Sequence, residues 1–201
     1  MKSKTIGLLT IVLVFLTISM KAQEYKPGKN EVTLGYGAFT GVEMANALFS
    51  IWPAMGMTIG KDSIKDYNCS FYGVGDVEYL RFVKPWLRVG ASLSVNPIST
   101  IITTKSGREL TWNYYVISVM PRIDFVYLNK GIFSMYSGIQ VGASLILWRD
   151  RQGSATFTDS GVSAAFHINA FGIRVGKEIG AYMEWGYGFR GTFNVGISGK
   201  F

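Results

Sequence analysis

His167 is the only histidine in the chain, and an imidazole is the side chain best suited to act as a general base near neutral pH. Ser163 precedes it on the same predicted strand, and Glu184 lies on the next one. A serine nucleophile, a histidine base and an orienting carboxylate would together support nucleophilic catalysis. The alternative, which we favour, is a histidine at a membrane interface with no catalytic role.

Charged side chains form a second group with possible chemistry, because they share one face of the predicted strands. If the strands close into a ring of eight, the interior is just wide enough for side chains to fill it. We therefore expect charges of opposite sign to pair there and to block the interior, with a narrow ion path or a proton relay as the alternative. The residues concerned are Asp76, Glu78, Arg88, Arg122, Asp124, Glu184 and Lys200.

No other sequence motif indicates a ligand or a reaction. The chain lacks a glycine-rich phosphate loop, a paired metal-ligand motif and a nucleophile elbow. Cys69 is the only cysteine, which excludes an intramolecular disulfide and a cysteine-based zinc site. We predict no catalytic, cofactor-binding or metal-binding residues and no cofactor.

The elements that must position these residues are strands. Apolar residues alternate with small or polar ones in segments long enough to cross a bilayer as tilted strands of about 9–11 residues. In the sixth segment the phase of alternation changes, which predicts a β-bulge near Gly172. The eight segments are about 31–40, 70–82, 87–95, 111–127, 132–147, 162–175, 181–188 and 192–201.

The connections between these segments alternate in length. Short turns follow the second, fourth and sixth segments, and Arg190 and Gly191 close the last hairpin. Long gaps fall at 41–68, 96–110 and 148–161. This alternation is typical of an up-and-down barrel with short turns on one side of a membrane and long loops on the other. A soluble β-sandwich or lipocalin-like barrel is the alternative, but it should place polar residues outside.

The first 22 residues have the pattern of a cleaved signal peptide. Lys2 and Lys4 precede an apolar stretch over 6–20, and the small residue Ala22 stands just before Gln23. A retained helical anchor is the alternative, although the stretch is shorter than the ~20 residues that a spanning helix needs. We therefore assign residues 1–22 to the signal and 23–201 to the barrel domain.

The composition favours a membrane or a large apolar surface, and the distribution of charge argues against a nucleic-acid partner. The chain is 48% hydrophobic and only 16% charged, with 24 glycines and 11 tyrosines. Removal of residues 1–22 takes away three lysines and no acid, so the formal charge falls from +7 to +4. The remaining basic residues are scattered and form no run of the kind that binds nucleic acid.

The first long gap, 41–68, is unusually apolar for a segment outside a cell. We expect it to fold over the mouth of the barrel or to pack on the membrane surface, with a docking site for a partner protein or lipid as the alternative. The apolar residues are Met44, Leu48, Phe49, Ile51, Trp52, Met55 and Met57.

Residues 31–201 resemble the small eight-stranded outer-membrane barrels of Gram-negative bacteria, the broad group that includes OmpX and the transmembrane domain of OmpA. The resemblance rests on the strand pattern and on the segment 193–201, which ends in the aromatic Phe201. The chain departs from many members at Gly199, where they carry an aromatic residue. The resemblance implies an outer-membrane location, contact with lipid and lipopolysaccharide, and recognition of the terminal strand by the barrel-assembly machinery.

The resemblance identifies fold and location better than activity. Lipid A deacylases of similar architecture use a histidine, a nearby serine and a carboxylate, but their His-x-Ser pattern is absent because Asn169 stands two residues after His167. We predict a non-enzymatic outer-membrane barrel with a structural or surface-binding role, in which 41–68 could receive a surface partner. The alternatives are a lipid A-modifying enzyme and a narrow ion channel.

Overall fold

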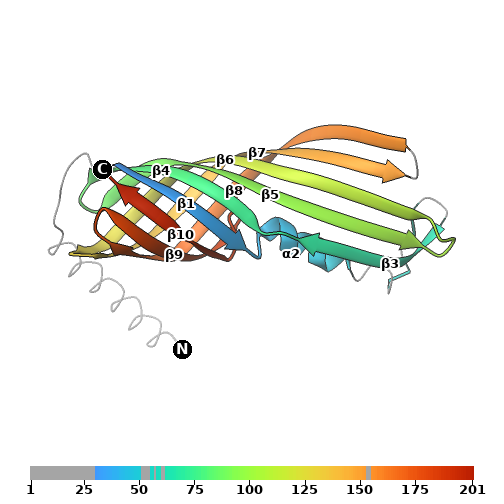
Figure 1. The fold of residues 1–201 in the computed structure, drawn as a ribbon, viewed down its shortest axis with the longest axis horizontal. Coiled ribbons are helices and arrows are strands. Elements are labelled where there is room, and N and C mark those ends of the chain that lie inside the picture. Colours follow the sequence, from blue (N-terminus) through green and yellow to red (C-terminus); the bar gives the residue numbers. More distant parts are fainter. Residues whose placement is uncertain (1–29, 51–54, 57, 60–61, 153–154) are drawn as a thin grey trace, which may run out of the picture.

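The computed structural model describes residues 30–50, 55–56, 58–59, 62–152 and 155–201 (Figure 1). The predicted signal peptide and its cleavage before Gln23 lie outside the described residues, as do Ile51, Trp52 and Met57 of the apolar segment. The described chain consists of strands and one short helix. In chain order the elements are β1 (Asn30–Ala38), α2 (Gly41–Phe49), β2 (Thr58–Ile59), β3 (Asp62–Phe71), β4 (Val74–Lys84), β5 (Leu87–Thr104), β6 (Glu109–Lys130), β7 (Phe133–Gln152), β8 (Ala155–Gly176), β9 (Ile179–Gly188) and β10 (Phe193–Lys200).

Eight of the described strands form a closed antiparallel ring. Each pairs with two neighbours in the order β1, β4, β5, β6, β7, β8, β9, β10 and back to β1. The closing pair places Val32 opposite Gly199 and Ala38 opposite Phe193. Closure satisfies the backbone groups on both sides of each ring strand, so the ring has no free edge. The predicted all-β antiparallel architecture is confirmed.

The side chains of the ring alternate as predicted, with polar residues inside and apolar residues outside. In β4, Asp76 and Glu78 are buried while Val77 and Tyr79 are exposed. The same alternation holds around the ring, because successive side chains of a strand point to opposite faces. The exposed outer residues include Leu34, Leu93, Val119, Ile123, Ile139, Val141, Ile168, Met183, Val195 and Ile197.

The predicted long loops at 96–110 and 148–161 are wrong. The described residues there extend β5 to Thr104, start β6 at Glu109, extend β7 to Gln152 and start β8 at Ala155. The segment after Pro97 is rich in β-branched residues, which favour extended chain, and burial still alternates along it, with the apolar Ile98 and Ile102 buried. Pro97 removes one backbone donor without ending the strand. Two long hairpins therefore project beyond the ring.

Together with β3, the projecting parts of β5 to β8 form a sheet that we call the extension, residues 62–71, 96–117, 146–152 and 155–166 (Figure 1). It has a small apolar core of its own in which Ile64, Tyr67, Ile102 and Leu110 are buried, and Cys69 and Trp112 pack against it. The core explains why these residues form a sheet rather than loops.

The predicted second strand, 70–82, is divided by the structure. Residues up to Phe71 belong to β3 in the extension, and β4 of the ring starts at Val74. Gly73 separates them with a φ of 71°, a left-handed conformation that favours glycine. A Cβ atom at this position would also overlap the Tyr36 hydroxyl group.

The first apolar gap is not simply a loop, because residues 41–49 form the helix α2. Thr40 caps its first turn, accepting from the Glu43 N–H at 3.1 Å, while the Glu43 carboxylate accepts from the Thr40 N–H at 2.8 Å. The helix lies where the ring meets the extension (Figure 1). In the described part of the chain, no helix has the length and apolar character needed to cross a membrane.

The predicted bulge in the sixth segment is confirmed. The register of β8 shifts against β9 between Asn169 and Phe171, and against β7 at the same level. Gly172 follows the bulge and faces Tyr136 of β7. A Cβ atom at Gly172 would overlap the Tyr136 ring, so this glycine makes room for an aromatic side chain inside the ring.

Replacing Gly172 by alanine is therefore expected to lower the free energy of unfolding by about 1–3 kcal/mol, because the tyrosine ring must be displaced from a filled interior. Gly199→Ala is the matched control, since no heavy atom lies within 4 Å of a Cβ atom there. Thermal unfolding followed by circular dichroism measures both. Equal transition temperatures for the two variants would contradict the assigned packing.

Candidate functional site

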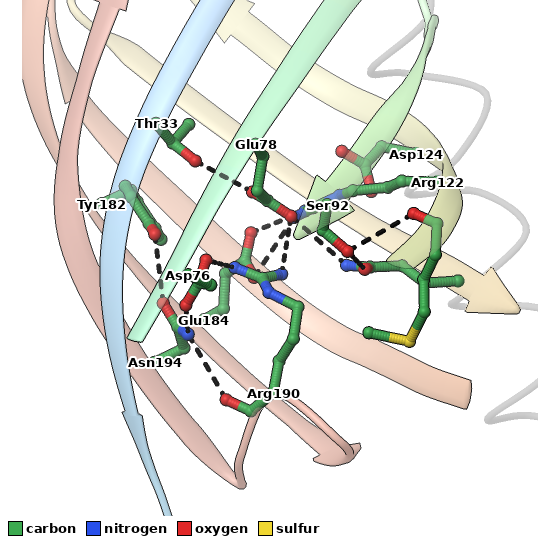
Figure 2. A network of polar contacts seen from close by, with 12 residues as sticks. Thr33, Asp76, Glu78, Ser92, Arg122, Asp124, Tyr182, Glu184, Arg190 and Asn194 are labelled. Carbon is green, nitrogen blue, oxygen red and sulfur yellow. Dashed lines mark hydrogen bonds and ion pairs between the residues drawn. The ribbon is translucent and has the colours of Figure 1, made fainter. Parts of the chain in front are cut away.

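The interior of the ring holds the largest group of chemically capable side chains in the described structure. Each of its nine charged residues is at most 3% exposed. They come from six strands and one turn, so that residues distant in sequence meet (Figure 2). The acids are Glu31, Asp76, Glu78, Asp124 and Glu184, and the bases are Arg88, Arg122, Arg174 and Arg190.

Two arginines and two glutamates form the centre of this network. Arg122 donates to Glu78 Oε1 at 2.6 Å and to Glu184 Oε1 at 2.6 Å. Arg190 binds Glu184 Oε2 at 2.8 Å and Glu78 Oε1 at 3.0 Å. The charges alternate around this group, which we call the central quartet. Each carboxylate therefore lies between two guanidinium groups that offset its loss of hydration.

Arg190 reaches the interior from the turn between β9 and β10. Gly188 and Gly191 flank it with φ values of 136° and 97°. In addition to Glu78 and Glu184 of the central quartet, its guanidinium binds Asp76 Oδ1 at 2.8 Å. A residue that the sequence analysis treated only as part of a tight turn thus contacts three buried acids (Figure 2).

A second cluster lies toward the end of the ring that contains both the start of β1 and the end of β10. Arg88 binds Glu31 at 2.8 Å and Asp124 at 2.7 Å, and Arg174 binds the other oxygen of Glu31 at 2.8 Å. The Arg88 guanidinium also lies 3.8 Å from the centre of the Tyr136 ring, a cation–π contact.

Asp124 joins the two clusters, because its second oxygen binds Arg122 at 2.8 Å. The ion pairs therefore form one connected chain through the interior. Each of the five interior acids is bound to at least one arginine. No group of three or more histidine, cysteine or acidic side chains in the described ranges is arranged to bind a metal ion.

The expected pairing across the interior is confirmed for Asp76, Glu78, Arg88, Arg122, Asp124 and Glu184, all of which are buried in ion pairs. Lys200 differs, since it is only half-buried and its ammonium group lies 5.6 Å from the centre of the Phe82 ring. It lies at the margin of the network, close to where the terminal strand ends.

Three of the interior charges are not predicted from the sequence: Glu31, Arg174 and Arg190. Glu31 is in phase with the inward residue Thr33, so the alternation itself contained this signal. Arg174 faces inward only because the bulge in β8 changes the phase after Asn169. Arg190 stands in a turn, where alternation does not apply, and no signal in the sequence indicates its contacts.

His167 does not lie at an interface, and that prediction is wrong. It is 1% exposed and faces the ring interior, because it is in phase with the buried Asn169 on β8. In the described structure neither of its ring nitrogens has a hydrogen-bond partner. Ser163 is exposed and its hydroxyl donates to the Ala164 carbonyl at 3.3 Å, while Glu184 is held by arginines. The structure does not join His167, Ser163 and Glu184 into a hydrogen-bonded triad.

We expect Arg190→Ala to lower the free energy of unfolding by about 3–5 kcal/mol, because it leaves the buried Asp76 without an arginine and leaves Glu78 and Glu184 with Arg122 alone. The matched control is Arg81→Ala, which removes an exposed arginine from the outer face of β4 and should change stability by less than about 0.5 kcal/mol. Urea unfolding of both variants measures the difference. A small effect at Arg190 would mean that water or another cation replaces its guanidinium.

Comparison with known proteins adds no family to this description. No protein-family model matches the sequence, and no curated protein matches it at a significant level. What the described residues show is a closed ring of antiparallel strands, apolar outside, with a connected network of ion pairs inside.

Proposed function

We propose that this chain is a non-enzymatic outer-membrane protein whose ring is an eight-stranded transmembrane β-barrel. The observation that carries the proposal is the inverted polarity of the ring. Its charges are buried in the interior, and its outer face exposes apolar side chains such as Leu34, Val141 and Ile197. Exposure of so much apolar surface to water would be unfavourable by about 25 cal/mol per Å², whereas in lipid it carries no such cost.

Aromatic side chains support the same proposal, because they occur near both ends of the ring. Trp86 and Phe125 stack at a centroid distance of 6.1 Å near the β4–β5 turn, and Lys84 lies over the Trp86 ring. Near the opposite end, Trp185 and Phe193 stack at 6.3 Å. Belts of aromatic residues at two levels are typical of membrane barrels, where amphipathic rings lie at the headgroups.

The arrangement of turns indicates the orientation that we propose. The short turns β4–β5, β6–β7 and β8–β9 lie at one end of the ring, and the extension projects from the other (Figure 1). Outer-membrane barrels have short turns on the periplasmic side and longer segments outside. In this orientation the extension reaches into the external medium.

A structural or surface-binding role fits the interior better than transport does. The central quartet and the Arg88 cluster fill the ring with paired charges of both signs, which favours a closed barrel over a channel. The enzyme alternative depends on His167, which has no bonded nucleophile in the described structure.

The extension provides a surface for binding. Between Ala155 and Phe166, β8 pairs with β7 only, because its pairing with β9 begins at His167. In the described structure this leaves one edge of the projecting sheet unpaired. An unpaired edge can accept a strand from another protein through main-chain hydrogen bonds. We therefore favour a role in which the barrel anchors the extension for contact with a partner outside the cell.

A labelling experiment tests location and orientation together. In a Cys69→Ser background, Lys105→Cys places a thiol on the β5–β6 turn of the extension, and Lys177→Cys places one on the short β8–β9 turn. Both positions are exposed lysines in turns, so they are matched. In intact cells a membrane-impermeant maleimide should label Lys105→Cys alone, and both after the cells are broken. Labelling of neither site in intact cells, or of Lys177→Cys alone, would refute the proposed orientation.

Deletion of Phe201 should lower the amount of folded protein in the membrane several-fold. Phe201 extends the closing pair, since Asn30 N–H donates to its carbonyl at 2.8 Å and its N–H donates to the Asn30 carbonyl at 3.0 Å. Loss of these bonds exposes backbone groups at the seam in lipid. Heat-modifiable gel mobility of membrane fractions measures folding, with Phe201→Tyr as the control that keeps an aromatic terminus. Equal folded amounts in the deletion and the parent would contradict a closing role.

A further inference from the structure

The helix α2 turns its polar side chains toward the protein and its apolar side chains outward, as the ring does. Its polar residues Glu43 and Asn46 are turned toward the protein, and Glu43 is buried. Met44 and Leu48, one turn apart, point away and are 46% and 68% exposed, and Phe49 is exposed beside them. A surface helix in water normally has the reverse arrangement.

Hydrogen bonds fix this orientation. The Glu43 carboxylate accepts from the Gly73 N–H at 3.1 Å, and the Tyr114 hydroxyl donates to the Asn46 amide oxygen. The Asn96 amide donates to the Thr40 hydroxyl at 2.8 Å. Turning the apolar face inward would break these bonds in buried surroundings, where each unpaired group costs about 1–3 kcal/mol. The helix therefore keeps its apolar face outward.

The start of α2 adjoins the apolar exterior of the ring. A Cβ atom at Gly41 would lie 3.7 Å from the Tyr187 ring, which is exposed on the outer face of β9. Phe39, just before the helix, is exposed and has a φ of 58°, a left-handed conformation that is uncommon for a bulky residue. Thr192 holds it there, because its hydroxyl donates to the Phe39 carbonyl at 2.9 Å. Phe39 turns the chain so that the helix begins beside Tyr187, at the end of the ring where Trp185 and Phe193 stack.

We propose that α2 is a membrane-surface helix that binds the lipid of the outer leaflet, with Met44, Leu48 and Phe49 at the boundary between headgroups and acyl chains. This inference rests on the proposed function, since it needs the ring to lie in a membrane. Lipid is the occupant that the geometry favours, because the apolar face continues the exterior of the ring and carries no charged residue. The binding would hold the first segment outside the ring against the membrane, together with the base of the extension to which Asn46 and Thr40 are hydrogen-bonded.

Fluorescence quenching in lipid vesicles tests this position. In a Cys69→Ser background, an environment-sensitive dye is attached to Leu48→Cys in the full chain, refolded into phosphatidylcholine vesicles. Some vesicles contain lipids with a nitroxide near the headgroup, and others contain lipids with a nitroxide deep in the acyl chain. Val141→Cys, on the outer face of β7, is the reference for the bilayer interior, and Lys105→Cys is the reference for water. Gel mobility verifies that each labelled variant is folded.

The dye at Leu48 should be quenched about twofold more by the shallow nitroxide than by the deep one, and it should be protected from aqueous iodide. The dye at Val141 should respond mainly to the deep nitroxide, and that at Lys105 mainly to iodide. If iodide quenches the dye at Leu48 as strongly as the dye at Lys105, while the dye at Val141 is still quenched from within the bilayer, the inference about α2 is overturned and the proposed function is not. That result points to a protein partner or to open water. Absence of lipid quenching at Val141 overturns the proposed function, and the inference with it.

Discussion

The pairing of arginines with carboxylates inside the ring is the constraint on which the rest of the structure depends. A ring of eight strands leaves no room for bulk water around nine charged side chains, so each must find its partner within the protein. Arg122 and Arg190 meet this requirement by binding Glu78 and Glu184 from opposite sides. The network holds only if every strand keeps its register, because a slip by one residue would turn the charges outward.

The burial of charge also explains several local features. Gly172 has no side chain because Tyr136 must fit beneath Arg88, and the bulge in β8 is needed to bring Arg174 to Glu31. The turn between β9 and β10 folds inward because Arg190 is bound by three acids. These departures from regular strand geometry occur where the ion pairs require them.

The ring and the extension share four continuous strands but differ in how they are stabilised. The ring interior is held mainly by ion pairs, beside a small apolar cluster of Phe82, Val126 and Tyr136. The extension instead has an apolar core of Ile64, Tyr67, Ile102 and Leu110. The helix α2 lies between them. It is tied to the extension by the Tyr114–Asn46 and Asn96–Thr40 hydrogen bonds, and its Glu43 carboxylate accepts from the Gly73 N–H, directly before β4 of the ring. The inverted polarity of the ring and of α2 leads to one proposal, that both contact lipid.

The sequence by itself determined the existence of the ring strands and which face of each is apolar, because alternation with a period of two is a local property of extended chain. It also determined the bulge near Gly172 and six of the buried charges. It could not show where β5 to β8 end, since the apolar–polar alternation of 87–95 is lost after Pro97 although the chain stays extended to Thr104, and no local signal separates the ring from the extension. Only the tertiary structure decided that His167 is buried and that Arg190 reaches Asp76, 114 residues away in sequence. Those facts depend on which side chains meet after the ring closes. Closure brings together residues that are far apart in the sequence, and the local pattern around one does not indicate its contact with the other.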